Sequence, residues 1–375
     1  MKERIVKTIV FIFISIAISA FLCAQSVPRK VQKGQEAWRA LKTAVTAFEM
    51  KDYGAAIEYA EKSRHIRMQD AQWQTYILES TLKKARVRRA GDDLDRVMPV
   101  LKELGLNDAL EIINYHFDKI GSGYFKNSYA KVFEYIPVFS HYPEADFLLG
   151  RIYRLEGELE IALGYMKSAY EYSINLDVPM EKYDLLYNIA DLSKDLGRYE
   201  DFEKYMLLVV KDCEQYNDHG FMKSLRRIID GDTGESVDKF FLLYRCDNTL
   251  AMKALIELSE FYKEMGENEK TLRCTSLASI MAVTKLEDVI GQRMNDFEFH
   301  GLGHLLKLCE RYPDIVEWGS RNNVWKLFCS FAESAGSNGK ILFARKLLLV
   351  LSESEPEEYW RRYASEIIIT NTVSD

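Results

Sequence analysis

Residues that interrupt helices are scarce in this sequence. Only seven prolines and 20 glycines occur among 375 residues. Proline removes a backbone donor and glycine lowers helix propensity, so their scarcity leaves room for long, uninterrupted helices. The content of 47% hydrophobic and 29% charged residues is that of a folded chain and excludes a low-complexity one.

Motifs of the common enzyme classes are also missing. The sequence has no G-x-S-x-G nucleophile elbow, no G-x-x-x-x-G-K phosphate loop and no G-x-G-x-x-G turn after a strand. We therefore predict a protein that is not an enzyme and that needs no cofactor. A catalytic pair assembled from distant carboxylates is the less favoured alternative, because most acidic residues fall on expected exposed helix faces.

Cysteine is present six times but never as C-x-x-C, which excludes a zinc knuckle and a thioredoxin-type redox pair. Apart from Cys23, each cysteine lies in an apolar stretch and is expected to be a small buried residue. Their number after removal of an N-terminal signal is odd, so one thiol at least stays unpaired in a monomer, and the disulfide state is left open. These five residues are Cys213, Cys246, Cys274, Cys309 and Cys329.

Two segments superficially resemble metal sites. The stretch 230–236 is rich in acidic residues, but Glu235 and Phe241 stand where an EF-hand needs its glycine and its bidentate glutamate. His300 and His304 are four residues apart, yet two glycines lie between them and no H-E-x-x-H pattern is present. We therefore predict no metal site.

The N-terminus has the pattern of an export signal over residues 1–24. Basic residues at Lys2, Arg4 and Lys7 precede an uncharged apolar stretch that ends at Ala24. The stretch is shorter than the roughly 20 residues of a secure membrane span. We predict export to the periplasm or cell envelope.

How the N-terminus is processed is left open by the sequence. Cleavage after Ala24 places a small residue at the cut, whereas lipidation at Cys23 would want a small residue before it and finds Leu22. An uncleaved membrane anchor is the third alternative. A short linker over residues 25–32 is expected to follow.

The acidic charge of the chain argues against a nucleic-acid partner. Removing residues 1–24 takes away three basic and one acidic residue and changes the formal charge from −7 to −9. Nucleic-acid binding favours a basic surface. We expect other proteins as partners, and contact with a membrane only through the N-terminal segment.

A repeat unit can be recognised near the middle of the sequence. Its pattern of Leu149, Gly150 and Tyr153, followed by Ala162 and by a bulky Met166, resembles the tetratricopeptide repeat, W-x2-L-G-x2-Y and then alanine and an aromatic. Asp146 stands in place of the tryptophan, and Met166 in place of the aromatic. The resemblance implies a right-handed α-solenoid of helix-turn-helix pairs.

Elementary packing explains these residue types. A small residue at Gly150 lets two paired helices approach closely, and Ala162 does the same from the second helix. Tyr153 and Met166 fill the space beside them. Gly157 stands at the turn between the two helices, where it can take a positive φ without steric cost.

Turn residues recur at nearly the repeat length. Steps of 32 to 40 residues separate nine positions, and the two 40-residue steps imply lengthened helices. We therefore predict an all-α array of about nine helix-turn-helix pairs over residues 33–353. The predicted turn positions are Lys51, Gly91, Gly123, Gly157, Gly197, Gly231, Gly266, Gly301 and Gly336.

A last helix is expected within residues 354–375, where it would cap the array. Ser354 and Pro356 are start signals for a helix. Four bulky residues would share one face of this helix and cover the open apolar end of the last pair. They are Tyr359, Trp360, Tyr363 and Ile367.

The resemblance also implies a function. Proteins of this family commonly hold a peptide or a partner's helix in a concave groove, which here would include Arg151, Arg154, Tyr187, Asp191 and Lys194. We expect a non-enzymatic scaffold or adaptor in the bacterial cell envelope. The alternative is a small-ligand or transporter-associated periplasmic binding protein with a cavity in the solenoid.

Overall fold

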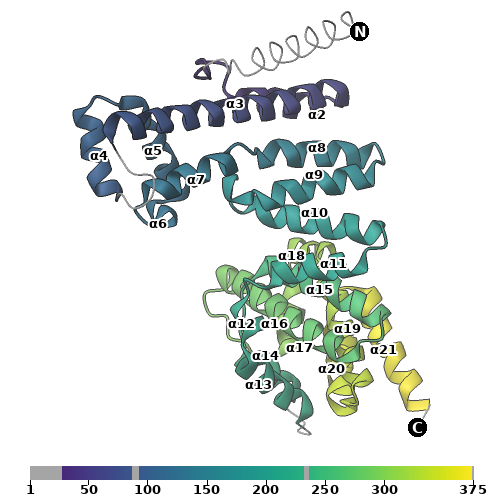
Figure 1. Cartoon of the computed structure of the whole chain (residues 1–375). Helices are drawn as coiled ribbons and strands as arrows, with labels where there is room; N and C mark the ends of the chain where they lie inside the picture. The colour runs from purple at the N-terminus through teal and green to yellow at the C-terminus, as the bar shows by residue number, and fades with distance from the viewer. Residues whose placement is uncertain (1–27, 87–92, 232–235, 374–375) are drawn as a thin grey trace, which may run out of the picture. The chain divides into compact units, whose positions relative to one another are not determined.

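All regular structure that can be described in this protein is helical. The computed structural model describes residues 28–86, 93–231 and 236–373, and within these ranges there is no strand, only an isolated bridge between Asp93 and Ser128 (Figure 1). The predicted all-α class is confirmed. The predicted signal at 1–24 lies outside the described residues, as does part of the predicted linker, and residues 28–32 form no helix.

The chain divides into two compact units, residues 1–185 and 186–375, which are described separately. The first unit contains eight α-helices, a short 3-10 helix and the beginning of α10 within its described residues. They are α2 (Ala37–Glu49), α3 (Tyr53–Ala85), α4 (Leu94–Glu103), α5 (Asn107–Ile120), α6 (Ser122–Phe125), α7 (Tyr129–Phe139), α8 (Pro143–Leu155), α9 (Leu159–Glu171), η1 (Ser173–Asn175) and α10 (Glu181–Asp195).

Helices α2 and α3 form the first antiparallel pair. Lys51 has a φ of 62° in the turn between them, and the side chain of Asp52 caps α3 by accepting a hydrogen bond from the backbone N–H of Ala55 at 3.1 Å. Ala44 and Ala56 face each other's helices and are fully buried. Helix α3 continues for 33 residues, which confirms the lengthening predicted for this step.

The pair α8 and α9 has the close packing predicted for the repeat (Figure 1). A Cβ on Gly150 would lie 3.2 Å from the carbonyl oxygen of Ala162 and closer still to Met166. Ala162 and Met166 are both fully buried, and the ring of Tyr153 stacks on that of Tyr165 at a centroid distance of 5.5 Å. The residues that match the repeat pattern therefore serve the close packing of α8 on α9.

Asp146, at the tryptophan position of the pattern, is buried on the face of α8 that meets α3. Its Oδ1 lies 2.7 Å from Nε of Arg64, and its Oδ2 accepts a hydrogen bond of 2.8 Å from the hydroxyl of Ser168. Burial raises the pKa of Asp146, and Arg64 opposes this rise. A charged pair thus replaces an apolar contact between neighbouring helices.

The far half of α3 packs in a second cluster with α4, α5, α6 and α7. Tyr129 on α7 is fully buried and its hydroxyl donates to the carbonyl of Leu78 on α3 at 3.0 Å. Phe117 on α5 stacks on Phe125 of α6 at 5.2 Å. One long helix therefore contributes to two hydrophobic clusters, one with α2 and α8 and the other with α4–α7.

The second unit continues from α10 with eleven further described helices. They are α11 (Tyr199–Val210), α12 (Glu214–Asn217), α13 (His219–Asp230), α14 (Ser236–Leu243), α15 (Thr249–Glu264), α16 (Asn268–Arg293), α17 (Leu302–Cys309), α18 (Pro313–Arg321), α19 (Val324–Ser337), α20 (Ile341–Ser354) and α21 (Glu358–Val373).

Helices of this unit pack in series. Helix α11 packs on α15, α15 on α16, α16 on α19, α19 on α20, and α20 on α21. Helix α16 has 26 residues and is buried on nearly all sides over its middle turns, as expected for a helix between two neighbours. Beside the series, five phenylalanines from α14, α19 and α20 pack together. They are Phe240, Phe241, Phe328, Phe331 and Phe343.

Four of the predicted turn positions have the expected geometry. Lys51, Gly157 and Gly266 have a positive φ between two paired helices, and Gly197 has a positive φ between α10 and α11. The 40-residue step after Gly157, however, does not contain lengthened helices. Its additional residues lie in η1 and in the connection that follows it, before α10 begins.

Two predicted turns were misplaced by two or three residues. Gly123 lies inside α6, and the positive φ of 93° belongs to Gly121. Gly336 lies inside α19, where it packs against Ala344, and the turn is at Gly339 with a φ of 76°. In both cases two nearby glycines were available, and glycine count alone does not distinguish a turn from a small packing residue.

Two further turn positions are helix ends rather than turns within a pair. Gly231 follows the last residue of α13 with a φ of −71°, and Gly301, with a φ of 115°, precedes the first residue of α17. Gly91 lies outside the described residues.

A helix is present where the capping helix was expected. Helix α21 begins at Glu358 and packs on α20 and α19, whereas Ser354 is the last residue of α20. Ala364 supplies a fully buried contact, but Tyr359 is exposed, so the predicted apolar face is only partly used. Among the helices described, none is both long and apolar enough to cross a bilayer.

Candidate functional site

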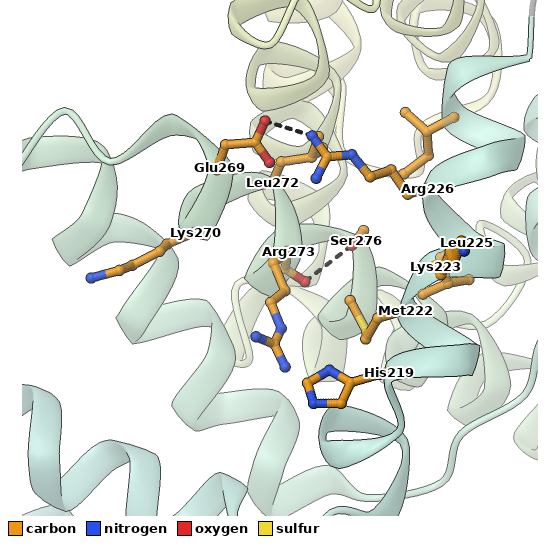
Figure 2. Close-up of a pocket in the computed structure, with 11 residues that line it drawn as sticks. His219, Met222, Lys223, Leu225, Arg226, Glu269, Lys270, Leu272, Arg273 and Ser276 are labelled. Atoms are coloured by element: carbon orange, nitrogen blue, oxygen red, sulfur yellow. Dashed lines mark hydrogen bonds and ion pairs between the residues drawn. The ribbon is translucent and has the colours of Figure 1, made fainter.

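The second unit contains a pocket between α13 and α16 (Figure 2). Its volume is about 460 Å³, and each helix contributes a stripe of side chains spaced by three or four residues. Such a stripe is one face of a helix. Helix α13 contributes His219, Met222, Lys223, Leu225, Arg226 and Ile229, and α16 contributes Glu269, Lys270, Leu272, Arg273 and Ser276.

Helix α13 is strongly amphipathic. Asp218 caps it by accepting hydrogen bonds from the backbone N–H groups of Gly220 at 2.7 Å and Phe221 at 3.1 Å. Leu225 and Ile229 lie one turn apart and are buried. The apolar side chains therefore form the floor of the pocket, while the basic side chains of α13 remain exposed at its rim.

An ion pair joins the two helices that line the pocket. The guanidinium of Arg226 lies 2.7 Å from a carboxylate oxygen of Glu269, drawn as a dashed line in Figure 2. Both side chains are more than half exposed, so this pair contributes at most about 1 kcal/mol and weakens with salt. A charged ligand can therefore displace it at small cost.

Arg273 is the most enclosed basic residue of the pocket. Its guanidinium carbon lies 4.1 Å from the centre of the Tyr216 ring, and Nη2 donates to the carbonyl of Tyr216 at 2.7 Å. Its Nε is buried and has no acceptor among the described residues. Figure 2 shows the side chain extending from α16 toward the end of α13 that carries His219. A hydrogen-bond acceptor on a ligand would satisfy the Nε–H group of Arg273.

The remaining basic residues lie at the rim. Lys270 points away from the pocket in Figure 2, 3.5 Å from a carboxylate oxygen of Glu203 and over the ring of Tyr262. Lys223 is exposed and has no ion-pair partner among the described residues. Lys223, Arg226 and Arg273, together with Glu269, thus surround an apolar floor, and this pocket is suited to an acidic, amphipathic ligand.

None of the five residues predicted for a partner-binding groove lines this pocket. In the first unit, Arg151 is exposed and its guanidinium carbon lies 4.7 Å from the centre of the Phe48 ring. Arg154 is half-buried on the same helix. Arg151 therefore covers an aromatic side chain of α2, which is a packing role for its flat cationic group.

The three groove residues predicted on α10 face α15 within the second unit. Tyr187 is buried, and its hydroxyl donates to the carbonyl of Leu250 at 2.5 Å. Burial raises the pKa of Glu257 on α15, and the nearby Asp191 raises it further while Lys194 opposes the rise. Tyr187 thus packs between α10 and α15, and its role as a groove contact stays a prediction.

The pocket could have been anticipated only in part. The sequence from 219 to 230 alternates basic and apolar residues with helical spacing, which is a recognisable signal of a basic amphipathic helix. The contribution of Arg273 has no comparable signal, because α16 is largely buried and its local sequence resembles a core helix.

The structure describes one of the two segments that resembled metal sites in full and the other in part. His300 lies before Gly301 and His304 within α17, and their ring centres are 5.2 Å apart. Asp230 pairs with Lys340 at 2.7 Å, and residues 232–235 lie outside the described residues. Among the residues that the structure describes, no group of three or more potential ligands could hold a metal ion.

The five described cysteines are all buried, as predicted. Cys274, Cys309 and Cys329 lie in helices, whereas Cys213 and Cys246 lie in the connections before α12 and before α15. The thiol of Cys213 donates to Oε1 of Gln215 at 3.6 Å, and the neighbouring thiol of Cys246 lowers the pKa of Cys213 to about 6. These two thiols are therefore neighbours.

Comparison with known proteins gives one extended similarity. The chain is similar to an uncharacterized protein of Treponema pallidum (strain Nichols), with 28% identity over 347 residues, which is 90% of this chain and 91% of that protein. No family model matches the chain. The similarity extends over both compact units and provides no activity to transfer.

Proposed function

We propose that this chain is a non-enzymatic adaptor of tetratricopeptide-like build that acts in the bacterial cell envelope. Its predicted export signal supports the location, and its paired helices with repeat-type packing at Gly150 and Ala162 support the build. The occupant that the site favours is an acidic amphipathic segment of another exported protein.

The pocket between α13 and α16 is the observation that carries this proposal. Its apolar floor would receive the apolar side chains of a partner segment, and its basic rim would receive carboxylates. The buried, unpaired Nε of Arg273 would gain an acceptor. The chain as a whole is acidic, with a formal charge of −7, so the positive rim is a local exception that can select a partner by charge.

Binding of a designed peptide tests the proposal. The probe is an amphipathic helical peptide with leucines on one face and glutamates on the other, labelled for fluorescence anisotropy. The comparison peptide has the same leucines with lysines in place of the glutamates. We expect the acidic peptide to bind at least tenfold more tightly, and its affinity to fall with added salt.

Charge reversal on α13 locates the binding. The double substitution Lys223→Glu with Arg226→Glu should weaken binding of the acidic peptide roughly tenfold or more. Arg227→Glu on the same helix is the matched control, because Arg227 is exposed but does not line the pocket. Equal affinity for both peptides, or an equal loss in the Arg227 variant, would refute the pocket as the partner site.

A further inference from the structure

A second pocket lies entirely within the first unit, next to the middle of α3. Its volume is about 390 Å³, and its wall includes Arg67 of α3 and three aromatic residues. The aromatic residues come from α2, from α5 and from the connection before α8. They are Trp38, Tyr115 and Tyr142.

Arg67 is held between two aromatic rings. Its guanidinium carbon lies 4.3 Å from the centre of the Phe139 ring and 4.4 Å from the centre of the Tyr142 ring. The residue is only 7% exposed. With its flat faces against aromatic rings, the guanidinium has its edge left for hydrogen bonds.

The edge of this guanidinium lacks an acceptor. Nε of Arg67 is buried without a hydrogen-bond partner, and no carboxylate of the described residues lies within ion-pair distance of it. Buried charged groups are almost always paired, because an unpaired one has lost its hydration without compensation. Burial raises the pKa of the nearby Asp70 and the charge of Arg67 lowers it, but the Arg67 guanidinium makes no hydrogen bond to the described residues in the wall of the pocket.

The neighbours of Arg67 do not supply this acceptor. Asp70, one turn along α3, lines the same pocket, and one of its oxygens accepts a hydrogen bond of 3.1 Å from the side-chain amide of Gln74. Gln74 in turn accepts a hydrogen bond of 2.8 Å from Nε2 of His116, whose ring is fully buried and neutral. These side chains are paired with one another rather than with Arg67.

The charges of the pocket limit its ligand further. Lys30 lines the pocket but already pairs with Asp108 at 3.0 Å. The acidic members of the wall are Glu36, Asp70 and Asp177. A ligand with a single negative charge can meet Arg67, whereas a dianion such as a phosphate monoester would be repelled by the acidic wall.

From this geometry we infer that the pocket binds a small monocarboxylate with an apolar or aromatic body. The planar carboxylate would accept two hydrogen bonds from the edge of the Arg67 guanidinium, which is the usual arrangement of arginine with a carboxylate. The apolar body would lie against Trp38, Tyr115 and Tyr142. This site is separate from the α13–α16 pocket and does not depend on the adaptor role.

Calorimetric titration of the full chain with matched probes tests the inference. The carboxylates are 3-phenylpropionate, phenylalanine and hexanoate, and the controls are 3-phenylpropionamide and phenyl phosphate. We expect at least one carboxylate to bind, and 3-phenylpropionamide and phenyl phosphate to bind at least tenfold more weakly than it. Comparison of phenylalanine with 3-phenylpropionate shows whether the site prefers an amino acid or a simple acid. Only phenylalanine has an ammonium group, which the carboxylate of Asp70 can bind.

Three substitutions locate the binding. Arg67→Met keeps an apolar side chain between the two rings and removes the guanidinium, so it should abolish carboxylate binding. Ile66→Glu places a competing carboxylate at the wall and should do the same without altering Arg67. Arg151→Met is the matched control, because Arg151 also lies over a phenylalanine ring but is exposed and outside this pocket.

Carboxylate binding by the three variants either supports or refutes the site at Arg67. Binding that is lost in the Arg67 and Ile66 variants and kept in the Arg151 variant supports the site, with circular dichroism showing that each variant is folded. If Arg67→Met does not fold, the Ile66 variant alone decides. Failure of every carboxylate to bind, or binding that both variants retain, would mean that Arg67 only holds the two rings together.

Discussion

A Cβ atom on Gly150 would lie 2.7 Å from Cγ of Met166, closer than side-chain carbons pack. The side chain of Met166 thus occupies the space that any larger residue at 150 would need. Gly150→Ala should destabilise the protein by about 1–3 kcal/mol, because it overpacks a filled interface. Urea denaturation followed by circular dichroism measures this difference.

Gly164→Ala provides the matched control for this substitution. Gly164 is exposed on α9, and a Cβ there would meet nothing within 4 Å. Alanine at this position should stabilise the helix by up to about 1 kcal/mol. A neutral effect of Gly150→Ala would mean that α8 and α9 can separate freely.

Protonation of His116 should couple the stability of the first unit to pH. Burial lowers the pKa of His116 from 6.5 to about 3, so the folded protein keeps it neutral. In the unfolded chain, His116 takes up a proton below its ordinary pKa of 6.5. The contribution of neutral His116 to stability is therefore fully present above pH 6.5 and is lost as the pH falls toward 3. At pH 5 the loss should be about 2 kcal/mol.

His116→Gln isolates this contribution, because glutamine can still donate to Gln74 but does not titrate. We expect denaturation midpoints of the variant to fall less than those of the parent protein between pH 7.5 and pH 5. Parallel pH profiles for the two proteins would contradict the assignment to His116.

Glu355 should give the second unit the opposite dependence on pH. It is fully buried, both of its carboxylate oxygens lack a hydrogen-bond partner among the described residues, and burial raises its pKa well above 4.5. The contribution of protonated Glu355 to stability is fully present below pH 4.5, its ordinary pKa. This contribution is lost as the pH rises through the raised pKa that Glu355 has in the folded protein. Glu355→Gln should therefore raise the melting temperature at pH 8 and change it little at pH 4.

Cys213 and Cys246 should form a disulfide under oxidising conditions. When local opening exposes the buried Cys213, its thiolate can attack oxidised glutathione, and the thiolate of Cys246 then displaces reduced glutathione, so that two thiols lose two protons and two electrons. Differential alkylation with mass spectrometry should find this bond, with the other three described cysteines still reduced. Cys246→Ser should leave Cys213 as a mixed disulfide, and a different pairing in the parent protein would disprove the prediction.

The sequence allowed the helical class and the close packing at Gly150 to be predicted, because both depend on local residue types. Turn positions were predictable where a single glycine was available, as at Gly157, and were misplaced where two competed, as at Gly336 and Gly339. The predicted contact Tyr187 proved to be buried, since one sequence cannot show which face of α10 meets α15. The pockets depend on side chains such as Arg67 and Arg273, whose neighbours are distant in sequence.

The single helix α3 has a mechanical consequence for the first unit. At 33 residues it is a rod roughly 50 Å long, and Arg67 lies close to its midpoint. A tilt of about 5° around that point would move each end by roughly 2 Å in opposite directions. A ligand beside Arg67 would contact α3 between the parts of the helix that belong to the two hydrophobic clusters, so a tilt of α3 at this point would displace both clusters.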